Sequence, residues 1–176
     1  QHQNRLRNLT LFSIAGGIIS IQIHIEWCAD DEARKNHIRT LLGESKHDCA
    51  LISPDLPLRV NLTAHENIAL ITQFHHATPW EEASAQAQSL LDCTGHGNIA
   101  LKRDEDLNMT QRFAVKMARA IMLRRPLIVI DRPAFMLADV PYPDALRAML
   151  GCLQHEYSNH SVVDYVWNQS IYEYQK

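Results

Sequence analysis

The feature that most constrains the fold is an alternation of short apolar segments with helix-forming stretches. Cys49–Ser53, Leu127–Asp131 and Val162–Trp167 have the apolar content of buried strands, and helical patterns lie between them. Parallel strands need long crossover connections, which are usually helices. The sequence therefore predicts an α/β fold with a mainly parallel central sheet flanked by helices.

Two capping boxes mark helix starts in the middle of the chain. Thr63-Ala-His-Glu66 is expected to open a helix through Ile71, and Asn108-Met-Thr-Gln111 a helix to about Leu123. Further helices are expected over Trp80–Leu91, over Ala145–Tyr157 and up to Leu42, just before Gly43. The block 61–123 is almost entirely helical, which predicts a helical lobe within a single domain of residues 1–176.

The N-terminal region carries a different pattern. Leu6–Ile14 is strand-like and is followed by Gly16-Gly17, which predicts a hairpin turn. From Ile18 to Trp27 apolar and polar residues then alternate, which predicts one long strand with a buried and an open face. We expect a small antiparallel β patch here beside the parallel sheet.

Composition limits the function classes. The 176 residues are 46% hydrophobic with a net charge of -3, so a basic nucleic-acid surface is not expected. No apolar run reaches the roughly 20 residues of a membrane span, and the polar N-terminus lacks a signal-peptide core. The start at Gln1 predicts a trimmed chain.

The cysteines and histidines form no recognisable metal motif. Cys28, Cys49, Cys93 and Cys152 are scattered, and we expect reduced thiols in a cytoplasmic protein. The adjacent His75 and His76 do not share a helix face, so surface or core roles are favoured over a metal site.

Four segments, taken in order, resemble the ATP-binding domain of ABC transporters. The family signature helix, LSGGQ-x-QRVAIARAL, is matched by Leu107–Ile121, and its Walker B strand, LLLLDEP, by Leu127–Pro133. Leu62–Leu70 is similar to the LTVxENIxL segment, and Ser161–Asn168 to the strand TvllVTHD. Each segment alone is a generic α/β feature, but the four together keep the family's order and spacing.

The resemblance implies a P-loop NTPase-like (ABC ATPase-type) fold in which most ATP-handling residues are replaced. The phosphate loop GxxxxGK[ST] falls on Cys28–Lys35, where both glycines are missing: Cys28 and Ala33 stand in their places. Asp30, Asp31 and Glu32 bring negative charge to the expected polyphosphate site. Arg34, or Lys35 with a shift of one residue, is left to replace the family's lysine.

The residues for hydrolysis are altered as well. The family's general-base glutamate corresponds to Arg132, which cannot accept a proton from water. By the same resemblance the switch histidine corresponds to Trp167, the Q-loop glutamine falls near Ser53, and the signature serine is Asn108. Gln111 and Asp131 are retained. Asp131 is either a Mg²⁺ ligand or a structural carboxylate bonded to nearby backbone amides, and we favour the structural role.

The preferred interpretation is a catalytically impaired pseudo-ATPase with a structural or regulatory role in a membrane transport complex, without a cofactor. The alternatives are a divergent active ATPase that uses ATP and Mg²⁺, and a soluble scaffold that reuses the fold. The resemblance implies a dimer with itself or with an active ABC ATPase. It also implies a membrane permease partner that docks on the helical lobe around Phe74, His75, His76 and Trp80, at the cytoplasmic side of the cell membrane. The alternative, which we weigh at least equally, is that Phe74 and Trp80 are core residues.

Overall fold

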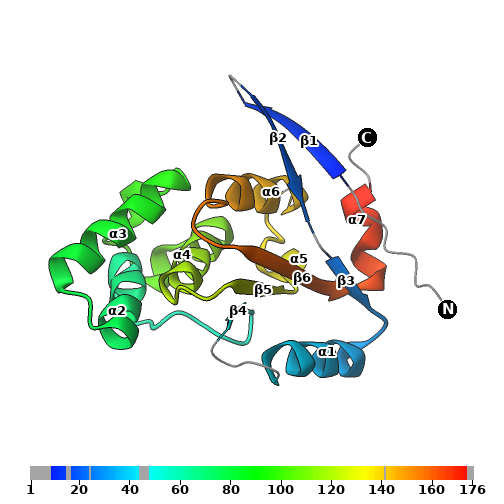
Figure 1. Ribbon diagram of the computed structural model, residues 1–176, viewed down its shortest axis with the longest axis horizontal. Helices are drawn as coiled ribbons and strands as arrows, with labels where there is room; N and C mark the ends of the chain where they lie inside the picture. Colours follow the sequence, from blue (N-terminus) through cyan, green and yellow to red (C-terminus); the bar gives the residue numbers. More distant parts are fainter. Residues whose placement is uncertain (1–8, 15–16, 24, 44–47, 141, 174–176) are drawn as a thin grey trace.

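The computed structural model describes residues 9–14, 17–23, 25–43, 48–140 and 142–173. Its centre is a four-stranded sheet in the order β3-β6-β5-β4, in which every neighbouring pair is parallel (Figure 1). These strands span Ile25–Cys28, Asn159–Tyr165, Leu127–Asp131 and Cys49–Ile52, in that order across the sheet. The α/β fold class with a parallel sheet is confirmed.

Alternate residues of the strands feed two apolar cores. Val129 and Val163 point to one face with Cys28, and Ile38 of α1 (Asp31–Gly43) covers them. Ile128 and Val162 belong to the larger core on the opposite face. β4 is apolar throughout and β5 is apolar up to Asp131, because a parallel sheet covered on both sides leaves no face for solvent. β3 and β6 also carry polar residues.

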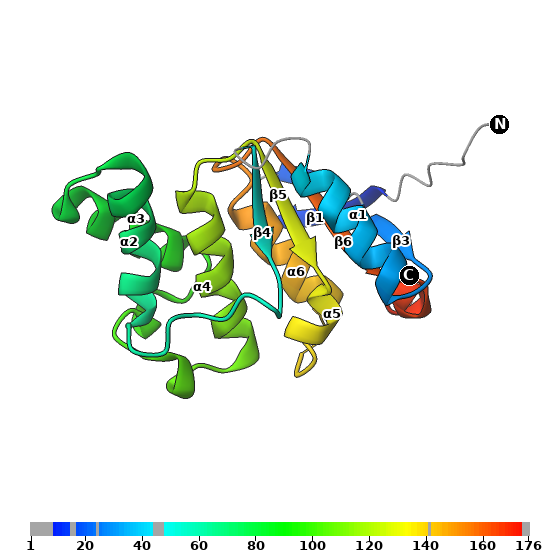
Figure 2. The same cartoon turned by 90° about the horizontal axis from the view of Figure 1, so that it is seen from below.

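Helices lie on both faces of this sheet. Figure 2 shows α1 on one side and, on the other, α5 (Pro133–Met136) and α6 (Tyr142–Cys152). After β6 the chain continues into the 3₁₀ turn η3 (Val166–Asn168) and the short α7 (Gln169–Glu173). None of the helices among the described residues is long and apolar enough to cross a membrane.

The middle of the chain forms a helical layer of α2 (Ala64–His76), α3 (Trp80–Cys93) and α4 (Met109–Met122), with the 3₁₀ turns η1 (Gly97–Ile99) and η2 (Asp104–Asp106) between α3 and α4. Both predicted capping boxes are present, at Thr63 before α2 and at Asn108 before α4. α4 lies between the rest of the layer and β4 (Figure 2). Its buried residues share one core with the sheet.

The prediction of one long strand after the hairpin is wrong. The chain instead forms two strands, and β2 (Gly17–Gln22) pairs only with β1 (Leu9–Ile14) in a separate antiparallel sheet. β3 begins at Ile25 and joins the parallel sheet. The alternating pattern therefore predicts correctly that this segment is extended. It does not predict that β2 and β3 belong to different sheets. Of the turn predicted at Gly16-Gly17, the first residue lies outside the described residues and Gly17 is the first residue of β2.

The expectation of reduced thiols is wrong for two of the four cysteines. Cys93 at the end of α3 and Cys152 at the end of α6 form a disulfide, with their Cα atoms 6.2 Å apart and 59 residues between them in sequence. Cys28 and Cys49 are free. A separation of this length cannot be read from cysteine spacing, because only the packed helices bring the two positions together.

Candidate functional site

The connection between β3 and α1, where the resemblance places the phosphate loop, is very short. β3 ends at Cys28 and α1 begins at Asp31, so only Ala29 and Asp30 lie between them. The carboxylate of Asp30 accepts a hydrogen bond from the backbone N–H of Ala33 at 2.8 Å. An N–H group that would face an anion at a helix start is therefore already occupied. The polar residues expected in a loop form the first turn of the helix.

Arg34 points inward from this first turn and binds the carboxylate at the end of β5. Its Nη1 donates to both oxygens of Asp131, at 3.0 and 2.9 Å. Arg34 is 3% exposed and Asp131 is 1% exposed, so this ion pair is enclosed by protein. Burial alone would lower the pKa of Arg34, but the hydrogen bonds to Asp31 and the charge of Asp131 raise it above its ordinary value.

Two further side chains complete the surroundings of Asp131. Ser53 follows β4 directly and donates its hydroxyl hydrogen to Oδ2 of Asp131 at 2.7 Å. Arg132 donates to the same carboxylate from Nε at 3.2 and 3.3 Å and from Nη2 at 3.1 Å. Side chains, and not the backbone amides that we expected, therefore hold Asp131. We call Arg34, Ser53, Asp131 and Arg132 the Asp131 network.

The backbone of Arg132 places its guanidinium in the network. Its φ is +51°, a left-handed conformation that is uncommon for a residue with a side chain. The turn leads from β5 directly into α5, with Pro133 at the first helical position. Nη2 of Arg132 also donates to Asp55 at 2.5 Å, so this side chain joins the sheet to the segment after β4.

A second carboxylate extends the network toward solvent. Asp31 accepts from Nη2 of Arg34 at 2.7 Å, from the hydroxyl of Tyr165 at 2.9 Å and from Lys35 at 2.6 Å. The hydrogen bonds from Lys35, Arg34 and Tyr165 together hold the pKa of Asp31 well below its usual range. Asp31, one of the acids of this helix start, is therefore neutralised by its own neighbours.

The segment after β4 is also bound by cations from α4. Lys116 is 7% exposed, and its ammonium donates to the carbonyl of Ser53 at 2.9 Å. Arg119 donates to the carbonyls of Pro57 and Leu56 at 3.1 and 3.3 Å. Burial and the neighbouring arginines lower the pKa of Lys116 to about 8.

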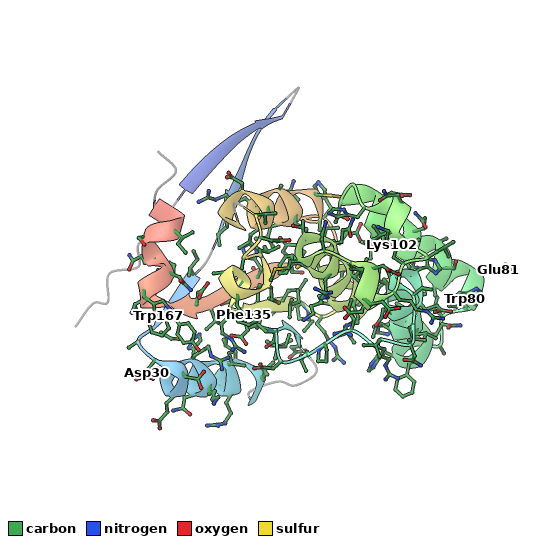
Figure 3. The ribbon with its side chains drawn as sticks, turned by 180° about the vertical axis from the view of Figure 1, so that it is seen from behind. Asp30, Trp80, Glu81, Lys102, Phe135 and Trp167 are labelled. Carbon is green, nitrogen blue, oxygen red and sulfur yellow. A yellow bond between two sulfur atoms is a disulfide. The ribbon has the colours of Figure 1, made fainter. Side chains whose placement is uncertain are left out.

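Of the residues singled out in the sequence, the structure brings only part together. Arg34, Ser53, Asp131 and Arg132 meet directly, whereas Lys35 reaches only Asp31 at the surface. The remaining ones lie outside the network. Cys28 is buried at the end of β3, Ala33 is exposed on α1, and Asn108 and Gln111 bind each other in the cap of α4. Trp167, which Figure 3 labels, is 60% exposed and stacked on Tyr165.

Sequence reasoning missed four contributors: Asp31 as a partner, Asp55, Lys116 and Tyr165. The spacing of Asp31 from Arg34 and Lys35, three and four residues, was a readable signal for helical ion pairs. Lys116 stands within an apolar run of a predicted helix, which marks a buried cation in need of an acceptor. Tyr165 and Asp55 carried no comparable signal, because their contacts depend on how distant strands end side by side.

A cleft of about 430 Å³ lies beside the network between α1 and the segment after β4. Arg34, Asp131 and Ser53 line it together with the apolar side chains of Ile38 and Leu51. The polar groups of the first three already bind one another. Within the described part of the chain, no cluster of three or more His, Cys, Asp or Glu residues is arranged to hold a metal ion.

Comparisons with known proteins identify the fold. No family model matches the sequence, and no curated protein matches it. Solved structures do match. Two are dimeric structures of the ATP-binding cassette MJ0796, one of them in a post-hydrolysis state with ADP and Pi; each has a TM-score of 0.64 at 17% identity and covers 91% of this chain and 86% of its own.

A third match is cbiO1 from Clostridium perfringens, described as part of the ABC transporter complex cbiONQ. Its TM-score is 0.63 at 12% identity, over 88% of this chain and 75% of cbiO1. At such low identities the shared property is the arrangement of the backbone. This chain therefore has the fold of the ATP-binding cassette of ABC transporters.

Proposed function

We propose that this protein is a pseudo-ATPase, a cassette that acts through its shape and its partners and does not hydrolyse ATP. The observation that carries the proposal is the Asp131 network. The carboxylate that the resemblance assigns to Mg²⁺ binds Arg34, Arg132 and Ser53 instead. Arg34, in the segment that resembles the phosphate loop, and Asp131, at the end of β5, form an ion pair with each other.

Binding of Mg²⁺ and ATP at this place would require the network to open. A metal ligand needs a free lone pair, and both oxygens of Asp131 accept from arginine side chains. Separating Arg34 from Asp131 would break a buried ion pair and leave Asp131 with only Arg132 and Ser53 as partners, which costs several kcal/mol. The β3–α1 connection consists of Ala29 and Asp30 alone, which is too short for a loop that wraps phosphates with successive amides and so returns that energy.

Hydrolysis lacks a base as well. The residue that follows Asp131 is Arg132, whose pKa is raised by its hydrogen bonds to Asp131 against the lowering effect of burial. It stays protonated at every working pH and cannot activate water. At the position of the switch histidine, Trp167 has only an indole N–H to offer. Phosphoryl transfer depends on positioned charges, and these have been replaced.

The partner of such a cassette is proposed to dock on the helical layer. A groove of about 640 Å³ on α2 is lined by Leu70, Ile71 and Phe74, with Arg59 and Arg119 beside them. Phe74 is 86% exposed. Apolar walls beside guanidinium groups fit an amphipathic segment with an acidic side chain. A membrane permease subunit, with this chain at the cytoplasmic face of the membrane, is the partner that the resemblance implies.

The second candidate function is a divergent, active ATPase in which Arg34 takes the place of the phosphate-loop lysine. It is favoured by one observation, the position of Asp131 at the end of β5 next to a cleft. In that case Arg34 would leave Asp131 when nucleotide arrives, and phosphate release would cease in an Asp131→Ala variant. A soluble scaffold without a membrane partner would share the inert site but would not bind a permease.

The deciding experiment is calorimetric titration of the full chain with ATP and Mg²⁺, with ADP and inorganic phosphate titrated in parallel. We expect no binding heat up to millimolar nucleotide and no increase in the melting temperature. The Arg34→Lys variant serves as a comparison, because the shorter ammonium loosens the bidentate pair while keeping the charge. Micromolar binding by the wild type would refute the pseudo-ATPase.

A further inference from the structure

We infer that Cys93 and Cys152 form a reversible redox switch that fixes the helical layer against the sheet. Cys93 is the last residue of α3, which belongs to the helical layer. Cys152 is the last residue of α6, which packs on one face of the sheet. Each sulfur also lies against the backbone carbonyl of the other cysteine. This inference is independent of whether the chain binds nucleotide.

Exposure makes Cys93 the cysteine most open to oxidants. Cys93 is exposed, Cys49 and Cys152 are half-buried, and Cys28 is 6% exposed; of the half-buried two, only Cys152 lies beside Cys93. Burial, aided by nearby carboxylates, raises the pKa of the Cys28 thiol, and burial also raises that of Cys49. Reaction with oxidants proceeds through the thiolate and needs access. Oxidation is therefore directed to Cys93 and its neighbour Cys152.

The chemistry is a thiol–disulfide exchange with a small-molecule disulfide such as oxidised glutathione. The Cys93 thiolate attacks one sulfur of the oxidant and releases one thiolate as a leaving group. The Cys152 thiolate then attacks Cys93 of the mixed disulfide and releases the second. The protein loses two protons and two electrons, and the oxidant is reduced to two thiols.

The physical consequence follows from the position of the bond. It closes a long chain segment that contains η1, η2, α4, β5 and α5, and so restricts the unfolded chain strongly. In the folded state it ties the end of α3 to α6, whereas the reduced protein holds the layer by noncovalent packing. Structural disulfides are rare in reducing cytoplasm, where the pairs that do form are usually redox-responsive.

The test compares the wild-type chain after equilibration with oxidised glutathione and after reduction. In the oxidised sample we expect a linked Cys93–Cys152 peptide by mass spectrometry, slower hydrogen exchange in α3, and a melting temperature higher by roughly 5–15 °C. Cys93→Ser should abolish all three differences. Cys49→Ser is the matched control and should leave them intact.

Several results would overturn the switch. They are a linked Cys28–Cys49 peptide, glutathione held on Cys93 with no internal link, or a linked pair that leaves exchange in α3 and the melting temperature unchanged. If Cys93→Ser does not fold, reduction of the folded wild type by a phosphine gives the same comparison without a substitution.

Discussion

At the scale of single residues, the Asp131 network supplies the partners that a buried carboxylate needs. A carboxylate at the end of a buried strand must be paired, because an isolated charge cannot be buried. In this chain the partners are Arg34, Arg132 and Ser53, all supplied by the chain itself. Substitutions in the network should therefore change the stability of the fold directly.

The first prediction concerns Arg34. Arg34→Ala should lower the free energy of unfolding by about 3 kcal/mol, because Asp131 loses its bidentate partner but keeps Arg132 and Ser53. Urea denaturation followed by circular dichroism measures the loss. Lys35→Ala, next to it in α1, removes an exposed cation and should cost much less. Equal losses in the two variants would mean that the buried pair contributes nothing special.

The second prediction is a pH dependence that arises from Lys116. Its pKa is lowered to about 8 in the fold, whereas the unfolded chain keeps the proton to about 10.4. Between these values the unfolded state binds more protons, so Lys116 makes the free energy of unfolding rise with pH. Below pH 8 the cost of burying its charged ammonium is present in full. We expect a gain of about 1–2 kcal/mol from this residue.

The comparison variant for that measurement is Lys116→Met, which keeps the apolar stem without the charge. The difference in unfolding free energy between wild type and variant, followed from pH 7 to pH 10.5, isolates Lys116 from Tyr157, whose pKa burial raises to about 12. A difference that stays flat, or one that shifts in favour of the variant as the pH rises, would contradict the assignment.

At the scale of elements, the two capping boxes determine where the helical layer begins. The hydroxyl of Thr63 accepts from the backbone N–H of Glu66, and Asn108 accepts from that of Gln111, while each partner side chain accepts from the N–H of the cap residue. The resemblance assigns Asn108 a place in the signature motif, and its geometry here is that of a cap.

Removal of either cap should therefore act on stability. Thr63→Ala and Asn108→Ala are each expected to cost about 1 kcal/mol of unfolding free energy, measured by thermal or urea denaturation. Thr40→Ala, at an exposed position within α1, is the control and should change stability by less than about 0.5 kcal/mol. An unchanged stability in Asn108→Ala would show that the cap of α4 is dispensable.

At the scale of the whole molecule, the layer and the sheet share one apolar core. Leu91 of α3, Phe113 of α4 and Ile130 of β5 belong to the same cluster of buried side chains. A common core favours one cooperative unit over a separately folding lobe. A shared core is what the proposed single domain, with a lobe at about 61–123, requires.

We predict a single unfolding transition for the reduced chain. Tryptophan fluorescence should report the same midpoint from Trp80 in the layer as from Trp27 in β3, each measured in a variant that keeps only that tryptophan. Trp167 is replaced in both variants and is exposed, so its loss should be tolerated. Two separate midpoints would instead make the lobe an independent domain.

Local signals in the sequence determined the elements with a strong pattern of their own. The capping boxes at Thr63 and Asn108 and the apolar run Leu127–Asp131 act within a few residues, so they can be read without a structure. The four segments that resemble an ATP-binding cassette were likewise visible in the chain alone, and they predicted the fold that the solved structures share. Helix ends were less well defined: α2 continues to His76, and α6 starts at Tyr142.

Only the tertiary structure decided which distant groups meet. Arg34 and Asp131 are 97 residues apart in sequence, and Cys93 and Cys152 are 59 apart. Such pairs form because parallel strands end at a common edge and helices cross over them, and no local pattern records that geometry. For the same physical reason, the break between β2 and β3 could not be read from their shared alternation: a period of two fixes the faces of a strand but not the sheet it joins.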